Sequence, residues 1–378
     1  MAIRKTSDCN GCPECIGCSL GKYRNAVFCD SCRHEIEDKV YIVEDMHLCE
    51  EWLWRRWCSL MWRSWWAMIK EISTKNMSRE EWLMHRRKAI GGSDAAAIVG
   101  LNTYSSPYEV WADKLGLVPP KEENEAMRIG HDLEDYVAKR FTEATGKRVR
   151  RKNAILYNTE IPFAHANVDR LIIGEDAGLE CKTTSVLNLK KFRDGEFPPH
   201  YYVQCQHYMM VTGLPKWYLA VLVLGREFLW FEIHRNEADI VALRQAEEAF
   251  WQHVTEEKPP ETDGSASCSD VIDVIYDEAD PGTEADISPF RQMLIMRENL
   301  MVQISEMEEQ KRAYENEIKA FLGETERGIC DGYRVSWRNA ERTTFDSKKY
   351  IEENPDDFVD YLKTTQYRSF RVTRMKEE

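Results

Sequence analysis

The sequence predicts a mixed α/β protein, and three observations support this fold class. Residues 78–257 alternate between segments of helical period and segments of strand period, the pattern of a sheet flanked by helices. Hydrophobic residues make up 43% of the chain and charged residues 31%, and no apolar run approaches the roughly 20 residues that a membrane span needs. The length of 378 residues exceeds the usual domain of about 100–200 residues, so we expect two or three compact units.

The expected elements of the middle segment follow from periodicity and from the residues that end helices. Helices are expected at residues 93–99, 128–145, 201–212 and 237–254. Strands are expected at residues 163–173, 179–184, 217–224 and 227–234. Gly146 and Gly213 each directly follow a helical pattern, as glycine does where a helix ends. The sequence therefore predicts a mixed central sheet flanked by helices.

Composition divides the chain around this core. Eight of the twelve cysteines fall within residues 1–58, which marks a Cys-rich module, and residues 59–77 form a Trp-rich connector. For the connector we favour a helix that packs on the next domain over a partner contact or a trace of recent sequence fusion. Residues 78–258 form the central domain, and a linker rich in Pro, Asp, Gly and Ser spans residues 259–289. A long helix and a small C-terminal unit occupy residues 290–378.

The long helix carries one apolar stripe. Its members are spaced mostly by three or four residues: Met293, Met296, Leu300, Ile304, Met307, Tyr314, Ile318 and Phe321. Such a stripe could serve a coiled coil or a subunit contact, but a helix lying on its own domain is the commoner outcome.

The net charge of −14 argues, taken alone, against a protein that grips a phosphate backbone. Its distribution weakens this objection, because residues 261–378 carry 16 basic and 27 acidic groups, whereas residues 78–260 carry 24 and 27. The middle segment also contains a compact basic cluster, formed by Arg148, Arg150, Arg151 and Lys152. Such a run is more often a solvated strand or loop than a binding patch.

Asp169, Glu180 and Lys182 form the strongest chemical pattern. Asp169 precedes a turn, and Glu180 and Lys182 lie on the strand after it. Because side chains alternate along a strand, Glu180 and Lys182 face one way, and Cys181 points into the opposite, packed face. Two converging carboxylates suit a hard cation such as Mg²⁺ (or Mn²⁺), and the lysine could orient or help deprotonate a water that attacks a phosphodiester. Alone, the triplet is weak, because such patterns are usually surface ion pairs.

Flanking motifs strengthen this pattern. Glu134 lies in the first turns of a predicted helix and could supply a third carboxylate, although taken alone it reads as an acid favoured by the helix dipole. Ser93 follows a glycine pair in N-cap position, downstream of the basic Arg86, and a helix N-terminus of this kind binds anions such as a terminal DNA phosphate. Gln204 shares a helix face with two tyrosines, and the three side chains could look into the cleft or lie in the core.

Together these motifs resemble a known family. Residues 82–234 look like the YqaJ-type viral recombinases, relatives of bacteriophage lambda exonuclease, which have a PD-(D/E)XK restriction-endonuclease-like core. The matching pieces are RRKAIGGSDAAAIVG, GHDLE, NVDRLI, LECKTT and YYVQCQHYMMVTG. The resemblance covers about half of the chain, and the long C-terminal helix with its small unit is similar to extensions in that family.

The resemblance implies a role for each residue of the metal site. Asp169 and Glu180 would bind Mg²⁺ together with the backbone carbonyl of Cys181. Lys182 would be the catalytic lysine. Glu134 would act as an additional acidic group near the metals.

The resemblance also implies how the protein would act on DNA. Gln204 would lie by the site, and Arg86 and Ser93 would bind the 5′-phosphate. Family members degrade one strand of duplex DNA from its 5′ end, leaving a 3′ overhang for a single-strand annealing partner, and some form a trimeric ring. We therefore expect a Mg²⁺-dependent 5′–3′ DNA exonuclease of phage-type recombination. The alternatives are an endonuclease or nickase with the same core, and a non-catalytic DNA-binding adaptor.

The cysteine spacing predicts a zinc site in the N-terminal module. The N-terminus lacks the apolar stretch of a secretory signal, so we expect a cytoplasmic protein whose thiols stay reduced. The family resemblance implies that it is phage- or prophage-encoded and acts in a bacterial host cell. The candidate ligands are Cys9, Cys12, Cys15, Cys18, Cys29, Cys32 and Cys49. Trp52 stands where a cysteine would complete a second pair with Cys49, so the last ligand stays open among His47, His34, Cys58 and the first cluster. An iron–sulfur cluster or unmetallated thiols are the alternatives.

Overall fold

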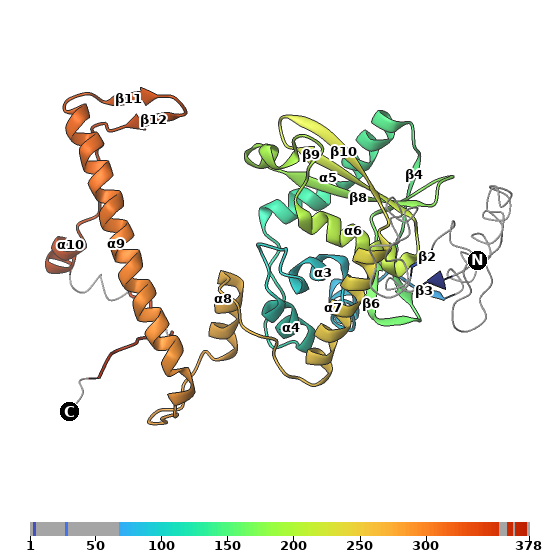
Figure 1. Ribbon diagram of the computed structural model, residues 1–378, viewed down its shortest axis with the longest axis horizontal. Coiled ribbons are helices and arrows are strands. Elements are labelled where there is room, and N and C mark those ends of the chain that lie inside the picture. Colours follow the sequence, from blue (N-terminus) through green and yellow to red (C-terminus); the bar gives the residue numbers. More distant parts are fainter. Residues whose placement is uncertain (1–2, 5–26, 29–67, 355–360, 366, 376–378) are drawn as a thin grey trace. The chain divides into compact units, whose positions relative to one another are not determined.

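The computed structural model describes most of the chain beyond the Trp-rich connector. The described residues are 3–4, 27–28, 68–354, 361–365 and 367–375 (Figure 1). The chain divides into two compact units, Met1–Ile275 and Tyr276–Glu378. Of the Cys-rich module, only the paired strands β1 (Ile3–Arg4) and β2 (Val27–Phe28) are described.

The first unit is built on a mixed five-stranded sheet with the strand order β10-β9-β8-β7-β4. Its strands are β4 (Val149–Arg151), β7 (Arg170–Ile172), β8 (Ala177–Thr184), β9 (Lys216–Val223) and β10 (Glu227–His234). β8 and β9 run parallel, and every other neighbouring pair runs antiparallel. A Cβ atom at Gly178 would lie 2.2 Å from the ring of Trp217, so glycine is required where this buried tryptophan crosses β8.

A second, antiparallel sheet has the order β3-β5-β6. Its strands are β3 (Ile69–Ser73), β5 (Ala154–Asn158) and β6 (Ile161–Asn167). The surrounding helices are α2 (Arg79–Arg87), α3 (Gly92–Ile98), α4 (Pro107–Leu115), α5 (Glu125–Thr145), the 3₁₀ helix η5 (Val186–Phe192), α6 (Pro199–Thr212), α7 (Glu237–Thr255) and α8 (Ala266–Ile275). Figure 1 shows α6 between the five-stranded sheet and the helices α3 and α7.

The core of this unit lies on both faces of the five-stranded sheet. On one face, Phe141 of α5 packs with Leu179 and Tyr218 in a buried cluster. On the other, Met209 of α6 packs with Trp217 in the largest cluster. The expected mixed α/β fold, with a central mixed sheet flanked by helices, is therefore what the structure shows.

Most of the expected elements are present. The helices expected at 128–145, 201–212 and 237–254 are α5, α6 and α7, and the hairpin expected at 217–234 is the antiparallel pair β9–β10. Gly146 and Gly213 end α5 and α6 in the left-handed conformation, at φ of 72° and 73°. None of the helices in the described part of the chain combines the length and the apolar character that a membrane crossing requires.

The single strand predicted at residues 163–173 is wrong. The segment forms two strands in different sheets, β6 and β7, separated at Val168 and Asp169. Most residues of the segment are buried on both sides of the break, so its apolar pattern continues through the break and does not reveal it.

Two predicted connections contain regular structure. The end of the Trp-rich connector is the strand β3, paired with β5, where a helix was predicted. The predicted linker at residues 259–289 contains α8, which packs on α4 and buries Cys268 and Val271. The sequence analysis missed this helix because Pro, Asp and Ser surround its apolar residues.

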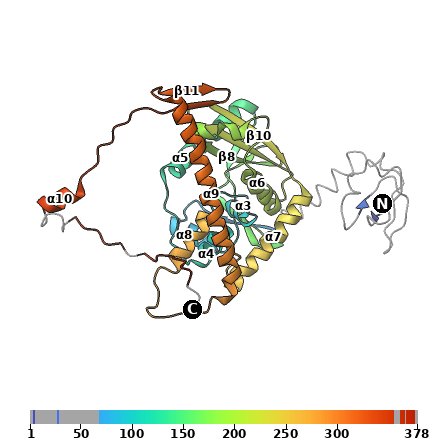
Figure 2. The ribbon, with the colours of Figure 1, turned by 60° about the vertical axis from the view of Figure 1, so that its left-hand side comes forward.

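The second unit consists of a long helix and small elements. They are η6 (Ser288–Phe290), α9 (Arg291–Leu322), the hairpin strands β11 (Arg327–Cys330) and β12 (Tyr333–Ser336), and α10 (Ser347–Glu353). Figure 2 shows α9 as one unbroken helix with the hairpin at its C-terminal end. The side chains of its predicted apolar stripe are exposed, and a coiled coil, a subunit contact and packing on the helix's own domain all stay predictions.

Candidate active site

Asp169 occupies the break between β6 and β7, where the chain leaves one sheet for the other. Val168 is buried beside it and anchors the turn. Oδ2 of Asp169 accepts a hydrogen bond of 2.8 Å from the backbone N–H of Cys181 on β8. The carboxylate is thereby held against the strand that carries the other predicted site residues.

Glu180 and Lys182 project from the same face of β8, as alternation along a strand requires. Oε1 of Glu180 lies 2.6 Å from Nζ of Lys182 and accepts a 2.7 Å hydrogen bond from Nε2 of Gln204 on α6. Cys181 packs on the opposite face against the α5 cluster. The structure therefore brings Asp169, Glu180, Lys182 and Gln204 together as the sequence predicts.

Asp169, Glu180 and Lys182 bring two carboxylates and one ammonium together, so their charges do not balance. Burial, the charge of Glu180 and the charge of Glu134 raise the pKa of Asp169 well above its usual value of 3.8. Burial disfavours the charge on Lys182, but the neighbouring Glu180 and Asp169 carboxylates outweigh this effect and raise the pKa of that ammonium. Oε2 of Glu180 is buried and has no hydrogen-bond partner among the described residues.

These features fit a hard divalent cation. An unpartnered carboxylate oxygen and a second carboxylate with a raised pKa are both stabilised by added positive charge. In the described part of the chain, no three His, Cys, Asp or Glu side chains come together as a metal site. A cation here would therefore rest on Asp169, Glu180, backbone oxygen and water, which suits Mg²⁺ because that ion keeps several waters.

Glu134, the predicted third acid, lies on α5 near this group but is already paired. Its Oε1 accepts a hydrogen bond from Nη1 of Arg170 and lies 3.8 Å from Nη2 of Arg151. Its charge still contributes to the raised pKa of Asp169. Arg170 was missed by the sequence analysis, because a buried arginine inside a strand has no periodic signal.

The α6 face predicted from Gln204 and two tyrosines lies at the site. The Gln204 amide donates both to Glu180 and, at 2.8 Å, to the hydroxyl of Tyr208. The ring of Tyr201 lies 5.7 Å from Nζ of Lys182, within the range of a cation–π contact. Gln204 therefore holds Glu180 in place from the side opposite to the strand.

Arg86 and Ser93 also lie together, but Ser93 does not cap the helix. Nη2 of Arg86 donates to Oγ of Ser93 at 2.8 Å and to Oδ1 of Asp94 at 3.1 Å. The N-cap of α3 is Gly91, whose N–H donates to Oδ2 of Asp94 at 3.0 Å. The predicted N-cap role of Ser93 is wrong, because the carboxylate of Asp94 reaches back to the start of the helix instead.

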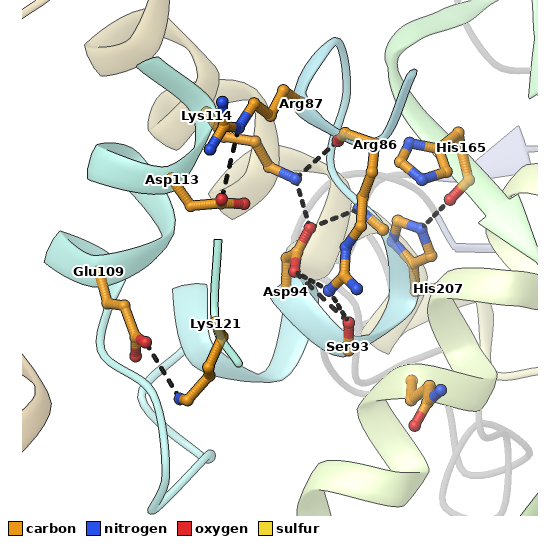
Figure 3. Close-up of polar contacts among 12 residues, drawn as sticks. Arg86, Arg87, Ser93, Asp94, Glu109, Asp113, Lys114, Lys121, His165 and His207 are labelled. Atoms are coloured by element: carbon orange, nitrogen blue, oxygen red, sulfur yellow. Dashed lines mark hydrogen bonds and ion pairs between the residues drawn. The ribbon is translucent and has the colours of Figure 1, made fainter. Parts of the chain in front are cut away.

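Asp94 is the centre of a buried ionic cluster that the sequence analysis missed. Figure 3 shows Lys114 of α4 and Arg86 of α2 both meeting its carboxylate, with Nζ of Lys114 2.6 Å from Oδ2. Burial opposes the charge, but Lys114 and Arg86 outweigh it and hold the pKa of Asp94 far below its usual value. A polar residue directly after Ser93 in an otherwise alanine-rich helix was the available signal.

A cavity of about 570 Å³ opens beside Asp169. Its lining includes the basic side chains of Arg79, Arg151, Lys152 and Arg170, together with Glu134. Part of the predicted basic cluster thus borders the site, although Lys152 is paired with Glu71 and Arg151 with Asp135. The predicted zinc ligands, from Cys9 to Cys49, lie outside the described residues.

The sequence is similar to those of known proteins. The model of the YqaJ-like viral recombinase domain matches residues 81–215, the segment that carries the site. The protein YqaJ of Bacillus subtilis (strain 168) is 42% identical over 313 residues, which cover 80% of this chain and 97% of that protein. The chain belongs to the YqaJ-like viral recombinase family.

Solved structures with partial similarity include two exonucleases. The alkaline exonuclease LHK-Exo from Laribacter hongkongensis is 23% identical, with a TM-score of 0.41, and the match covers 47% of this chain and 93% of that one. A phage-related exonuclease from Haemophilus somnus 129PT is 14% identical, with a TM-score of 0.35, and the match covers 45% of this chain and 96% of that one.

Proposed function

We propose that the protein is a Mg²⁺-dependent DNA exonuclease of the PD-(D/E)XK type that hydrolyses linear duplex DNA from its 5′ ends. The observation that carries this proposal is the convergence of Asp169 and Glu180 beside Lys182, with a buried Glu180 oxygen left without a partner. Membership of a viral recombinase family supports a role in phage-type recombination.

Each residue of the site would have a different role in phosphodiester hydrolysis. Asp169, Glu180 and the carbonyl of Cys181 would hold Mg²⁺ (or Mn²⁺), which supplies stabilisation of the negative charge on the scissile phosphate. Gln204 orients Glu180 through its amide. Lys182, which lies beside Glu180, would orient the attacking water or help deprotonate it.

Arg86 and Ser93 form the proposed end-binding pair. The guanidinium is already fixed by Asp94, so it presents a defined geometry to a terminal phosphate without first losing side-chain freedom. Counting Arg86, Lys114 and Asp94 together leaves one net positive charge, which favours a phosphate. α3, which carries Ser93, is in contact with α6, which carries Gln204, so a 5′ end bound at Ser93 would lie on an element next to the helix that orients Glu180.

The single-strand annealing partner and the trimeric ring are proposed from the family resemblance alone. The zinc in the N-terminal module is proposed from the spacing of its cysteines. An endonuclease, a nickase and a non-catalytic adaptor are the competing outcomes of the experiment that follows.

A digestion assay on matched DNA substrates tests the proposed function. Purified protein is incubated with Mg²⁺ and linear, nicked or covalently closed circular DNA, the linear DNA bearing either 5′-phosphate or 5′-hydroxyl ends. We expect digestion of the linear 5′-phosphorylated DNA and survival of the closed circle. Cleavage of the circle would instead indicate an endonuclease, and intact DNA in every tube with Mg²⁺ or Mn²⁺ would indicate an adaptor.

A further inference from the structure

A buried histidine–carboxylate pair lies beneath the end-binding pair and takes no part in the proposed chemistry. His207 on α6 and Glu247 on α7 are both fully buried, and Nδ1 of His207 lies 2.7 Å from Oε1 of Glu247. The other ring nitrogen, Nε2, lies 2.9 Å from the backbone carbonyl oxygen of His165 on β6. His207 thus links the Glu247 carboxylate on α7 to one backbone carbonyl of β6.

The chemistry of this contact fixes the role of each ring nitrogen. A carbonyl oxygen can only accept, so Nε2 of His207 must carry a hydrogen. Burial disfavours a charged ring, but the Glu247 carboxylate and the two hydrogen bonds outweigh this and raise the pKa of His207 above its usual value. The pair therefore holds its proton, and His207 remains a donor to His165.

His165 is in turn tied to the turn that carries the end-binding residues. Its N–H donates to the carbonyl of Ile90 at 2.9 Å, and the N–H of Ile90 donates to the carbonyl of Phe163 at 2.8 Å. The His165 ring packs on Gly91, where a Cβ atom would lie 3.3 Å from Nε2 of that ring. Burial and the charge of Lys114 lower the pKa of His165 to about 3, so the ring is neutral.

The same helix meets the turn at a second point. A Cβ atom at Gly92 would lie 2.6 Å from the Tyr208 ring and 3.1 Å from the Gln204 side chain, so α6 and the turn are in close contact there. Figure 3 shows His207 and His165 next to Arg86, Ser93 and Asp94. α6 therefore carries Gln204, which orients Glu180, and also touches the turn that precedes Ser93.

We propose that His207, held by Glu247, is a positioning residue that sets the Arg86–Ser93 pair at a fixed place relative to Glu180 and Gln204, through the carbonyl of His165. This inference rests on the proposed function. Its consequence is that the preference for 5′-phosphorylated ends depends on one buried hydrogen bond from His207 to β6.

Two substitutions at His207 separate this hydrogen bond from general stability. The amide nitrogen of His207→Gln reaches the place of Nε2 and keeps a donor to the His165 carbonyl, whereas that of His207→Asn falls near Nδ1 and keeps only the bond to Glu247. Each variant thus retains one of the two buried bonds and is expected to lose similar thermal stability. Glu247→Gln is a third variant, because its amide can donate to Nδ1 while Nε2 still donates to His165.

The measurement is the affinity of the full chain for linear duplex DNA with 5′-phosphate or 5′-hydroxyl ends, in EDTA, together with KM and kcat in Mg²⁺. We expect His207→Asn to reduce the preference for 5′-phosphate about tenfold, as the loss of one buried hydrogen bond predicts, and to raise KM more than it lowers kcat. His207→Gln and Glu247→Gln are expected to keep the parent's preference.

The outcomes separate this inference from the proposed function. If the parent protein prefers 5′-phosphate and His207→Asn keeps that preference, the inference is wrong while the proposed function stands. An equal loss in His207→Asn and His207→Gln would also overturn it, because the effect would then follow stability. A parent protein that binds both ends equally refutes the proposed end recognition, and this inference with it.

Discussion

Asp94 and Asp169 are two aspartates withdrawn from solvent, yet their pKa values are shifted in opposite directions. Burial acts in the same direction on both, but Asp94 meets Lys114 and Arg86, whereas Asp169 meets two other carboxylates and one lysine. The neighbouring charges therefore decide the sign of each shift. The Asp94 cluster is electrostatically complete within the protein, and the Asp169 cluster lacks positive charge that a cation would supply.

The largest expected effect is on activity, when the incomplete cluster loses a carboxylate. Asp169→Asn should reduce digestion of linear DNA by about 10³-fold or more, roughly 4 kcal/mol of activation free energy, because the metal loses a ligand. The Asn oxygen can still accept the hydrogen bond from Cys181, so the fold should be kept. The rate of mononucleotide release from linear duplex measures the effect.

Asp176→Asn is the matched control, since this exposed aspartate lies in the turn between β7 and β8. It should digest DNA at the parent rate. If Asp169→Asn retains parental activity, the assignment of this cluster as the metal site is wrong.

For the Asp94 cluster, we expect the loss of its carboxylate to lower stability. Asp94→Asn leaves Lys114 and Arg86 without a counter-charge and should lower the free energy of unfolding by about 3 kcal/mol. The measurement is urea denaturation at pH 7, with Asp169→Asn, which removes a like charge, as the comparison. We expect that second variant to be as stable as the parent or more stable, so a similar loss in both variants would contradict the comparison.

The two differences in stability should depend on pH in a defined way. The pKa of Asp94 is lowered in the folded state, so its ionisation stabilises the protein above the ordinary value of 3.8 and ceases to do so as pH falls towards the folded value. The pKa of Asp169 is raised, so the benefit of keeping its proton is full below 3.8 and lost as pH rises through the folded value. In acid, the free energy of unfolding of both variants should therefore approach that of the parent. At pH 7 we expect Asp94→Asn to be less stable than the parent and Asp169→Asn to be as stable or more stable, and urea denaturation at several pH values tests whether both differences shrink.

Added Mg²⁺ should stabilise only the incomplete cluster. At free Mg²⁺ 100-fold above its dissociation constant, binding to the folded state alone contributes about 2.7 kcal/mol. We expect the melting temperature of the parent to rise with Mg²⁺, that of Asp94→Asn to rise by a similar increment, and that of Asp169→Asn to stay unchanged. Equal rises in all three proteins would place the bound ion elsewhere.

The elements that could be predicted from the sequence are those specified by local pattern. α5 carries helical periodicity, α5 and α6 both end at glycines, and the β9–β10 hairpin has an apolar-rich run on each side of Gly225. The break at Asp169 could not be predicted, because residues on both sides of it are buried in different sheets. Local periodicity reports burial and does not report which sheet a strand joins.

The residues of the site could likewise be predicted only where a local pattern marks them. Glu180 and Lys182 share a strand face, so their spacing shows that they can meet. Asp94 and Lys114 are separated by 20 residues, and His207 and Glu247 by 40, and no pattern marks such tertiary pairs. The sequence therefore identifies the groups that carry the proposed chemistry, and the structure adds those that hold them in place.

The smallest expected effect separates charge from geometry at the end-binding pair. Arg86→Lys keeps the positive charge beside Asp94 but loses the fork that reaches both Ser93 and Asp94. We expect the preference for 5′-phosphate over 5′-hydroxyl ends to fall about tenfold, or about 1.4 kcal/mol, with little change in stability, because the carboxylate keeps a counter-charge. Competition between the two DNA ends for the protein in EDTA measures this preference.

Arg87→Lys is the matched control for that substitution. In the described part of the chain, Arg87 forms an ion pair with Asp113 of α4 and no hydrogen bond with Ser93. Its preference should equal that of the parent. If Arg86→Lys also keeps the full preference, net charge alone recognises the phosphate, and the closed geometry around Asp94 serves stability only. A loss confined to Arg86→Lys would mean that the complete cluster also contributes to recognition, by holding the guanidinium in the orientation that a terminal phosphate meets.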